Sequence, residues 1–200
     1  MTGERAFNLL AGLSVMSWAV LGIRFGSDTV DYSAARLCIA TQHVCVGFFF
    51  VVRKPLSAEG SVADFARCVP SLVLCYGIFM ISQPLAAWPV AAELIFAVGT
   101  LVVVVAFVSL GRSFAILPAV RTLVRSGPYR IVRHPAYAGE FLMALACCVA
   151  VPRLASLSIL ILLLPAIMWR ICVEEALLLR EAAYAEYAEA VRWRLLPGVW

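Results

Sequence analysis

The chain has 200 residues, of which 64% are hydrophobic and 14% are charged, and its net charge is +4. Soluble domains are usually about half apolar and about a quarter charged. This chain therefore has too much apolar surface to bury in one water-soluble core, and we expect a lipid bilayer to cover its outside. Its lysines and arginines form no basic run interleaved with aromatic residues, which argues against a nucleic-acid partner.

Six segments are apolar enough to be considered as membrane spans, since a spanning helix needs about 20 mostly apolar residues. They cover residues 6–24, 34–52, 68–86, 90–110, 135–151 and 154–173. The fifth is short, and Val151-Pro152-Arg153 after it predicts the turn of a tight helical hairpin, because proline is tolerated in the first turn of a helix. The expected fold class is all-α, a polytopic membrane helix bundle with about six transmembrane helices (five to six) and a C-terminal helical hairpin.

The distribution of positive charge predicts the orientation. With six spans, most of the 16 lysines and arginines lie in the segments on one side, including the five arginines between residues 111 and 134. The segments on the other side hold only Arg24, Arg36 and Arg153. Because cytoplasmic loops carry an excess of lysine and arginine, both termini and the 111–134 loop are expected in the cytoplasm.

Residues 174–192 alternate charged and apolar side chains at helical spacing. This pattern predicts an amphipathic helix that extends the sixth span out of the bilayer and then lies on the cytoplasmic surface. We interpret the chain as one integrated domain, in which residues 1–110 are transmembrane scaffold helices and residues 111–200 are the working region.

Cysteine and histidine usage predicts no metal site. The seven cysteines lie in or beside apolar segments without a Cys-x-x-Cys pair, and the chain has only two histidines. A zinc site needs clustered ligands, whereas scattered cysteines in apolar segments behave as small hydrophobic residues.

The 111–134 loop has five arginines and no acidic residue, and it ends in an unusual combination of residues. Gly127-Pro128 is a turn signal. Pro135 keeps His134 out of helical geometry and can itself be the first helical residue. His134 is therefore expected just before the N-terminus of the fifth helix. The positive-inside rule explains the arginines, but it does not explain the close spacing of Gly-Pro-Tyr and Arg-His-Pro.

Ionisable residues near the end of the sixth span complete a candidate site. Arg170 and Glu174 are four residues apart and so share a helix face, whereas Glu175 points elsewhere. Ionisable groups at this depth either reach the interface or carry function. If the last two spans form a hairpin, the start of the fifth lies beside the end of the sixth. One pocket is then lined by His134, Tyr137, Arg170 and Glu174.

Residues 111–200 resemble the isoprenylcysteine carboxyl methyltransferases and, more distantly, the phospholipid N-methyltransferases. The resemblance rests on Gly-Pro-Tyr-Arg-Ile-Val-Arg-His-Pro-Ala-Tyr-Ala-Gly at 127–139 and on Arg-x-x-x-Glu-Glu at 170–175. It is extended by Tyr184, Tyr187 and the Arg-Leu-Leu-Pro at 194–197. It implies an S-adenosylmethionine site at the cytoplasmic face and an acceptor that enters from the bilayer, with S-adenosylhomocysteine as a product.

The resemblance also implies roles for single residues. Glu174 would bind the amino-acid or ribose part of the cofactor, Arg170 would face the acceptor, and these two are the candidate catalytic residues. Arg121 stands where the family often has histidine, so it could alter the cofactor contacts or bind the cofactor carboxylate. The candidate cofactor-binding residues are Arg121, Val124, Gly127, Tyr129, Arg133, His134, Pro135, Tyr137, Gly139, Glu174 and Glu175.

These residue types suit methyl transfer. The cofactor carries a carboxylate, an ammonium group and an adenine ring, which call for a cation, an acid and an aromatic or apolar slot. The chain has no Gly-x-Gly-x-x-Gly, which excludes the soluble dinucleotide-type fold as the route to this cofactor. The in-line displacement depends on proximity and alignment. Arg170 could clamp a carboxylate acceptor, whereas an amine acceptor would need Glu174 or Glu175 as a base.

We therefore expect an S-adenosylmethionine-dependent integral membrane methyltransferase that acts on a lipophilic or small carboxylate or thiol acceptor. One alternative is a phospholipid amine N-methyltransferase that uses the same cofactor pocket. Another is a non-catalytic membrane protein that keeps the pocket as a ligand sensor. A transporter is less favoured, because inward-facing charges in the spans are few: Glu93 lies near a helix start, Glu140 is one turn into the fifth span, and His43 is alone. The sequence leaves the acceptor and the oligomeric state open.

Overall fold

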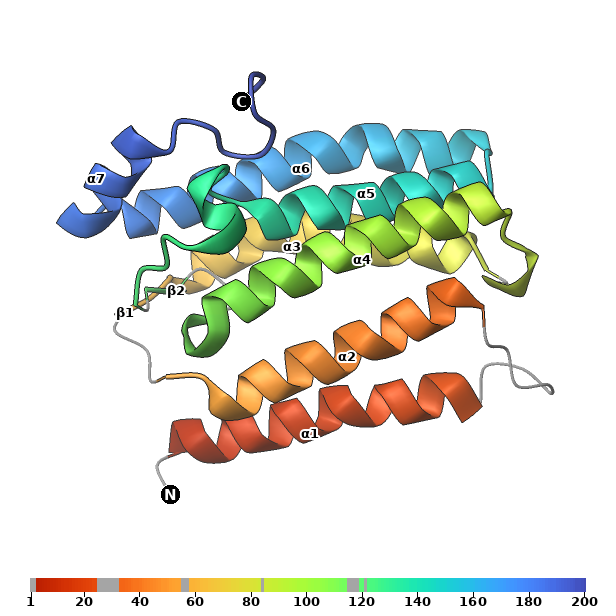
Figure 1. Ribbon diagram of the computed structural model, residues 1–200, viewed down its shortest axis with the longest axis horizontal. Coiled ribbons are helices and arrows are strands. Elements are labelled where there is room, and N and C mark those ends of the chain that lie inside the picture. The colour runs from red at the N-terminus through yellow and green to blue at the C-terminus, as the bar shows by residue number, and fades with distance from the viewer. Residues whose placement is uncertain (1–2, 25–32, 55–57, 84, 115–118, 121) are drawn as a thin grey trace.

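The computed structural model describes residues 3–24, 33–54, 58–83, 85–114, 119–120 and 122–200. These residues form a bundle of long helices that run alternately in opposite directions, with a short helix across one end (Figure 1). The long helices are α1 (Gly3–Arg24), α2 (Ala34–Val52), α3 (Val62–Ile81), α4 (Val90–Leu110), α5 (Pro135–Ala150) and α6 (Leu154–Leu178). The short helix is α7 (Ala182–Ala190).

Five of the described helices, α1 to α4 and α6, are long and apolar enough to cross a membrane. The apolar helix α5 has 16 residues, and at 1.5 Å per residue it is about 24 Å long, which is less than the hydrocarbon core of a bilayer. The prediction of an all-helical membrane bundle with five to six spans is confirmed.

The third span lies earlier in the chain than the predicted 68–86. Helix α3 begins after Ser61, whose hydroxyl accepts a hydrogen bond from the backbone of Asp64 while the Asp64 carboxylate accepts one from the backbone of Ser61. This capping box adds a polar first turn that an apolar pattern does not reveal. The helix ends at Ile81, and Leu85–Ala87 form a separate 3-10 turn, η1.

Short elements join the connections at the α7 end of the bundle. Strands β1 (Ala58–Glu59) and β2 (Ala119–Val120) pair antiparallel, so they tie the α2–α3 connection to the α4–α5 connection. The second of these connections also contains two 3-10 turns, η2 (Gly111–Ser113) and η3 (Gly127–Arg130).

The predicted hairpin between the last two long helices is present, because α5 ends at Ala150 and α6 begins at Leu154. Helix α5 lies against α4 on one side and against α6 on the other (Figure 1). The buried core is where these helices pack with α3, and it includes Ile78, Phe96 and Ile167.

Helices α4 and α5 approach closely at a pair of glycines. A Cβ atom at Gly139 would lie 2.6 Å from the carbonyl oxygen of Gly99, and one at Gly99 would lie 2.9 Å from the carbonyl oxygen of Gly139. Small residues let helix backbones approach in this way in membrane proteins. Gly139 is a candidate cofactor-binding residue in the sequence, and in the structure it is the backbone of α4 that approaches it.

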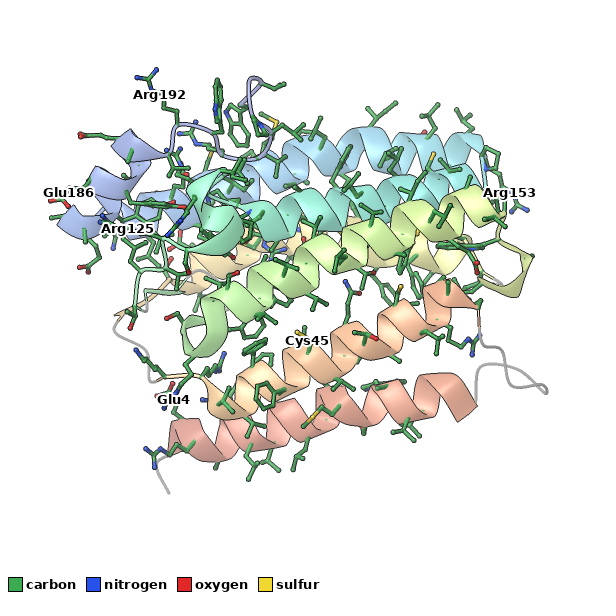
Figure 2. The ribbon with its side chains drawn as sticks, in the orientation of Figure 1. Glu4, Cys45, Arg125, Arg153, Glu186 and Arg192 are labelled. Carbon is green, nitrogen blue, oxygen red and sulfur yellow. The ribbon has the colours of Figure 1, made fainter. Side chains whose placement is uncertain are left out.

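The alternation of helix directions brings the arginine-rich connections to one end. Arg125, Glu186 and Arg192 lie at the end that carries α7, whereas Arg153 lies at the opposite end (Figure 2). The start of α1 and the end of α6 share the α7 end (Figure 1). The cytoplasmic location of this end stays a prediction, as does the division of the chain at residue 110.

The glycine contact predicts a local stability effect. Gly139→Ala should lower the free energy of unfolding by about 1–3 kcal/mol, because the added methyl group overpacks the α4–α5 contact. Gly77→Ala on α3 is the control, since its Cβ would meet only Ile159 Cδ1, at 4.0 Å. Thermal unfolding of both variants in detergent, followed by circular dichroism, measures the difference. Equal midpoints for the two variants would contradict the close contact.

Candidate active site

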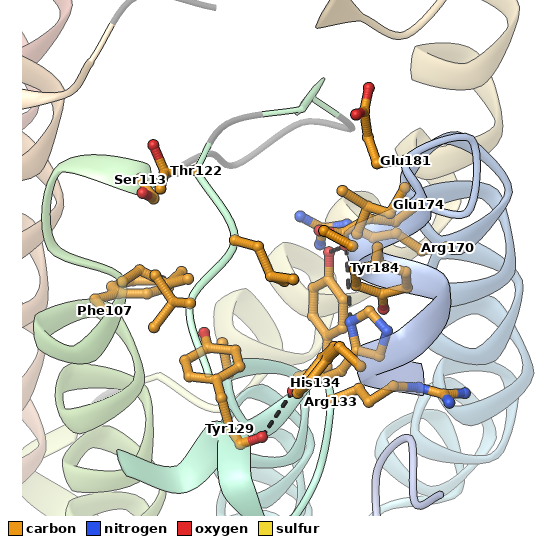
Figure 3. A pocket seen from close by; sticks show the side chains of 18 of the residues that line it. Phe107, Ser113, Thr122, Tyr129, Arg133, His134, Arg170, Glu174, Glu181 and Tyr184 are labelled. Carbon is orange, nitrogen blue, oxygen red and sulfur yellow. Dashed lines mark hydrogen bonds and ion pairs between the residues drawn. The ribbon is translucent and has the colours of Figure 1, made fainter. Parts of the chain in front are cut away.

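A cavity of about 390 Å³ lies at the α7 end of the bundle, between α4, α5, α6, α7 and the segment that precedes α5. Figure 3 shows Phe107 and Tyr129 on one side of it, with Arg170, Glu174 and Glu181 on the other. Its lining residues are Phe107, Leu110, Ser113, Thr122, Leu123, Val124, Tyr129, Arg133, His134, Ala136, Tyr137, Glu140, Arg170, Glu174, Leu178, Glu181, Ala183, Tyr184 and Tyr187.

The start of α5 meets the end of α6 at this cavity. The hydroxyl of Tyr137 donates a hydrogen bond to Oε2 of Glu174 at 2.6 Å. Nδ1 of His134 lies 3.9 Å from the same carboxylate oxygen, and its ring stacks on Tyr137 with centroids 5.6 Å apart. The predicted convergence of these residues at one cavity is confirmed, because the hairpin returns α6 to the level at which α5 begins.

Arg170 crosses from α6 to α5 at the floor of the cavity. Its side chain is buried, with Nη1 3.5 Å from Oε2 of Glu140. The guanidinium also lies 4.7 Å from the ring centroid of Tyr137, a distance at which a cation is attracted to an aromatic face. The sequence did not assign Glu140 to the site, although an acidic residue in a membrane helix is a functional candidate by default.

Glu175 lies behind the cavity and does not line it. Its buried carboxylate accepts hydrogen bonds from Nε of Arg194 at 2.7 Å and from the hydroxyl of Tyr184 at 3.4 Å. It also forms an ion pair with Nε of Arg133 at 2.7 Å and contacts Nε2 of His134 at 3.1 Å. The sequence grouped Glu175 with the cofactor-binding residues, whereas its carboxylate has partners within the protein and orients two residues of the cavity wall.

The chain that follows α7 forms hydrogen bonds with Arg133 and His134, the two residues that precede α5. The backbone N–H groups of Arg133 and His134 donate to the carbonyl oxygens of Trp193 and Arg194, at 2.9 and 2.8 Å. The guanidinium of Arg133 also donates to two backbone carbonyls near the end of α7. The chain that follows α7 therefore positions His134 through both backbone and side-chain contacts.

Three tyrosines form an aromatic wall on the α7 side. Burial raises the pKa of Tyr187 to about 12, and burial also raises the pKa values of Tyr129 and Tyr184 well above their usual range. All three hydroxyls therefore stay protonated at neutral pH and can donate hydrogen bonds. The hydroxyl of Tyr187 donates to the carbonyl oxygen of Tyr129 at 2.7 Å, which joins α7 to η3.

The predicted site residues divide into two groups. Those that line the cavity are Val124, Tyr129, Arg133, His134, Tyr137, Arg170 and Glu174. Gly127, Pro135, Gly139 and Glu175 do not line it, and Arg121 lies outside the described residues. Gly127 has a φ of 60°, a left-handed conformation that favours glycine, so it shapes the turn before the cavity. Pro135 is the first residue of α5, as predicted.

A comparison with protein families gives this geometry a context. Residues 87–186 match the family model described as phospholipid methyltransferase, which is half of the chain. The chain belongs to this family. It is therefore a multi-pass protein of a family of membrane methyltransferases, and the resemblance noted in its sequence is confirmed at this level. No curated protein and no solved structure matches the chain.

The family match includes α4, α5 and α6 and the start of α7, whereas Tyr187 of the cavity wall lies just beyond it. It runs from the residues before α4 into α7. Helices α1, α2 and α3 lie outside it.

The arrangement around Glu175 predicts a large stability effect. Glu175→Ala should lower the free energy of unfolding by about 3–5 kcal/mol, because it leaves buried cationic partners without their counter-charge. Glu186→Ala is the matched control, because this side chain is 74% exposed and lies 3.7 Å from Arg125, so its loss should cost about 1 kcal/mol or less. Thermal unfolding in detergent compares the two. A Glu175 variant as stable as the control would contradict the structural role.

Proposed function

We propose that the cavity binds S-adenosylmethionine and that the protein transfers its methyl group to a lipophilic acceptor with a carboxylate or thiol group. The observation that carries the proposal is the convergence of Tyr137, Glu174 and Arg170 at one cavity within the residues matched by the methyltransferase family. The contact between the start of α5 and the end of α6 supplies both an acid and a cation there.

The size and chemistry of the cavity support this ligand. Its volume of about 390 Å³ is within the range of about 300–1,000 Å³ that is common for small-molecule sites. The side chain of Glu174 is 25% exposed, so its carboxylate can accept hydrogen bonds from the ammonium group or the ribose hydroxyls. Tyr129 and Tyr187, both protonated at neutral pH, line the cavity with aromatic rings against which the adenine ring can pack.

When bound, S-adenosylmethionine would supply an electrophilic methyl group: the carboxylate or thiolate of the acceptor would form a bond to the methyl carbon as the sulfonium–carbon bond breaks, and S-adenosylhomocysteine would keep the electron pair on sulfur. The residues of the chain align the acceptor and exclude water, since this displacement depends on proximity more than on acid–base chemistry. Arg170 binds an anionic acceptor, and Glu140 holds Arg170 in place through their ion pair.

A phospholipid amine is the second candidate acceptor, and two observations favour it. The family description names phospholipids, and the carboxylates of Glu140 and Glu174 both line the cavity. An amine acceptor has to lose a proton before it can attack the methyl group, and either carboxylate can act as the general base.

The cofactor site predicts a selective binding defect. Glu174→Gln should weaken binding of S-adenosylmethionine by roughly tenfold to a hundredfold, the loss expected for a hydrogen bond to a charged group, and His134→Ala should weaken it as well. Glu189→Gln, an exposed change on α7 outside the cavity, should bind as wild type. Equilibrium dialysis with labelled cofactor measures all of them, and circular dichroism checks their folding. Unchanged binding in folded Glu174→Gln and His134→Ala would place the cofactor elsewhere.

Methyl transfer from labelled cofactor then separates the acceptor classes. We expect products from dodecanethiol or dodecanoate in membranes that contain the wild-type chain, and roughly tenfold to a hundredfold less with Glu174→Gln at limiting cofactor. Methylation of phosphatidylethanolamine alone would favour the amine reaction. Cofactor binding without transfer to any of the three acceptors would favour a non-catalytic ligand sensor.

A further inference from the structure

Residues 191–200, which follow α7, form a segment that we call the strap. It runs back beside α6 (Figure 1) and lies beyond residue 186, where the family match ends. The backbone N–H groups of Arg194, Leu195 and Leu196 all donate to the backbone oxygen of Trp200, at 2.9, 3.0 and 3.3 Å. The strap is therefore a closed loop with a defined outer face.

The strap has one buried side and one exposed side. Leu195 belongs to the buried apolar core, and Trp200 packs against that core. Leu196 and Val199 are instead 51% and 76% exposed, and Trp193 is 38% exposed. Apolar side chains that gather on one exposed face indicate an interaction surface.

The segment before α5 adds to the same face. The strap is hydrogen-bonded to the backbone of Arg133 and His134, so the residues just before these two lie close to the start of the strap. Among them Ile131 is 59% exposed, and Arg130 is exposed as well. Arg192 of the strap points away from the bundle (Figure 2). The exposed apolar side chains are thus flanked by cations.

The length of α6 gives the depth of the strap in a bilayer. Helix α6 begins at Leu154, at the opposite end of the bundle. About 20 helical residues cover the roughly 30 Å of hydrocarbon in a bilayer, so Glu175 is near the level of the phospholipid headgroups. Nε of Arg194 lies 2.7 Å from Oε2 of Glu175, which brings the strap to the same level. Tryptophan is enriched at this depth, and arginine can reach phosphate groups from it.

We propose that the strap docks on the bilayer surface at the α7 end, with Leu196 and Val199 in the interface and with Arg130 and Arg192 on the headgroups of anionic phospholipids. Charge complementarity identifies the partner as anionic. Neither the strap nor residues 127–134 contain an acidic residue. Within the described part of the chain, neither of the two arginines forms an ion pair with a carboxylate.

The strap also connects this surface to the cavity. Its carbonyl groups accept hydrogen bonds from Arg133 and His134, and Arg194 donates to Glu175. His134 lines the cavity, so a strap that is held by the bilayer keeps this part of the cavity wall in place. The negative charge of the bilayer surface therefore strengthens binding in the cavity. This coupling rests on the proposed function, whereas the contact with phospholipid does not.

Photocrosslinking tests the contact with phospholipid. The full-length chain carries Leu196→p-benzoylphenylalanine and is reconstituted in nanodiscs of equimolar phosphatidylcholine and phosphatidylglycerol, and mass spectrometry identifies the adducts. We expect phospholipid adducts in which phosphatidylglycerol is enriched roughly fivefold or more, the effect of one or two arginines near an anionic surface. The enrichment should disappear when Arg130→Gln and Arg192→Gln are added.

The control for crosslinking is Glu186→p-benzoylphenylalanine on α7, where the native side chain is 74% exposed. It should give few phospholipid adducts, because α7 lies beyond the end of α6 (Figure 1). Absence of adducts at residue 196, or adducts in the proportions of the bulk lipid, would overturn the proposal.

Cofactor affinity tests the coupling. The wild type should bind S-adenosylmethionine roughly fivefold more tightly in the mixed nanodiscs than in phosphatidylcholine alone. The combined Arg130→Gln and Arg192→Gln variant should bind as the wild type does in phosphatidylcholine and should show no gain in the mixed nanodiscs. Arg180→Gln is the matched control, since it removes an exposed arginine between α6 and α7, outside the strap, and it should keep the gain.

Reciprocity provides a further check, because saturating cofactor should raise the enrichment of phosphatidylglycerol at residue 196 by the same factor. A gain that persists in the combined variant would reflect attraction of the cationic cofactor to the charged surface and would overturn the coupling. Failure of the wild type to bind S-adenosylmethionine in either nanodisc would overturn the proposed function alone, because the crosslinks still decide whether the strap contacts phospholipid.

Discussion

Two adjacent carboxylates near the end of α6 face in different directions, and the geometry of the site depends on the buried one. Glu175 neutralises Arg133 and Arg194 and contacts His134, so a single residue fixes the segment before α5 and the chain after α7. A buried carboxylate is stable only with such partners. Successive residues in a helix are about 100° apart, so Glu174 is left to face the cavity and accept the hydroxyl of Tyr137.

Close helix packing sets the distances across the rest of the site. Because Gly99 and Gly139 let the backbones of α4 and α5 touch, Phe107 on α4 lines the cavity together with residues of α5. Larger residues at these glycines would separate the helices. The contact therefore links a local requirement for small side chains to the shape of the cavity.

The ion pair of Arg170 with Glu140 links helix packing to the proposed reaction. It joins α6 to α5, and both of its residues line the cavity. A buried pair of this kind keeps each charge stable while the other remains present. In the proposed function, the same pair that stabilises the α5–α6 contact also receives the reactive end of the acceptor.

The sequence by itself determined the helical membrane architecture, the hairpin at Val151–Arg153 and the meeting of Tyr137 with Glu174, because span length, proline position and helical spacing are local signals. It placed the third span wrongly, since a capping box lies outside the apolar pattern. Only the tertiary structure decided that Glu175 faces inward and that Glu140 pairs with Arg170. These features depend on how helices distant in sequence rotate and pack against one another, and no local pattern specifies that rotation.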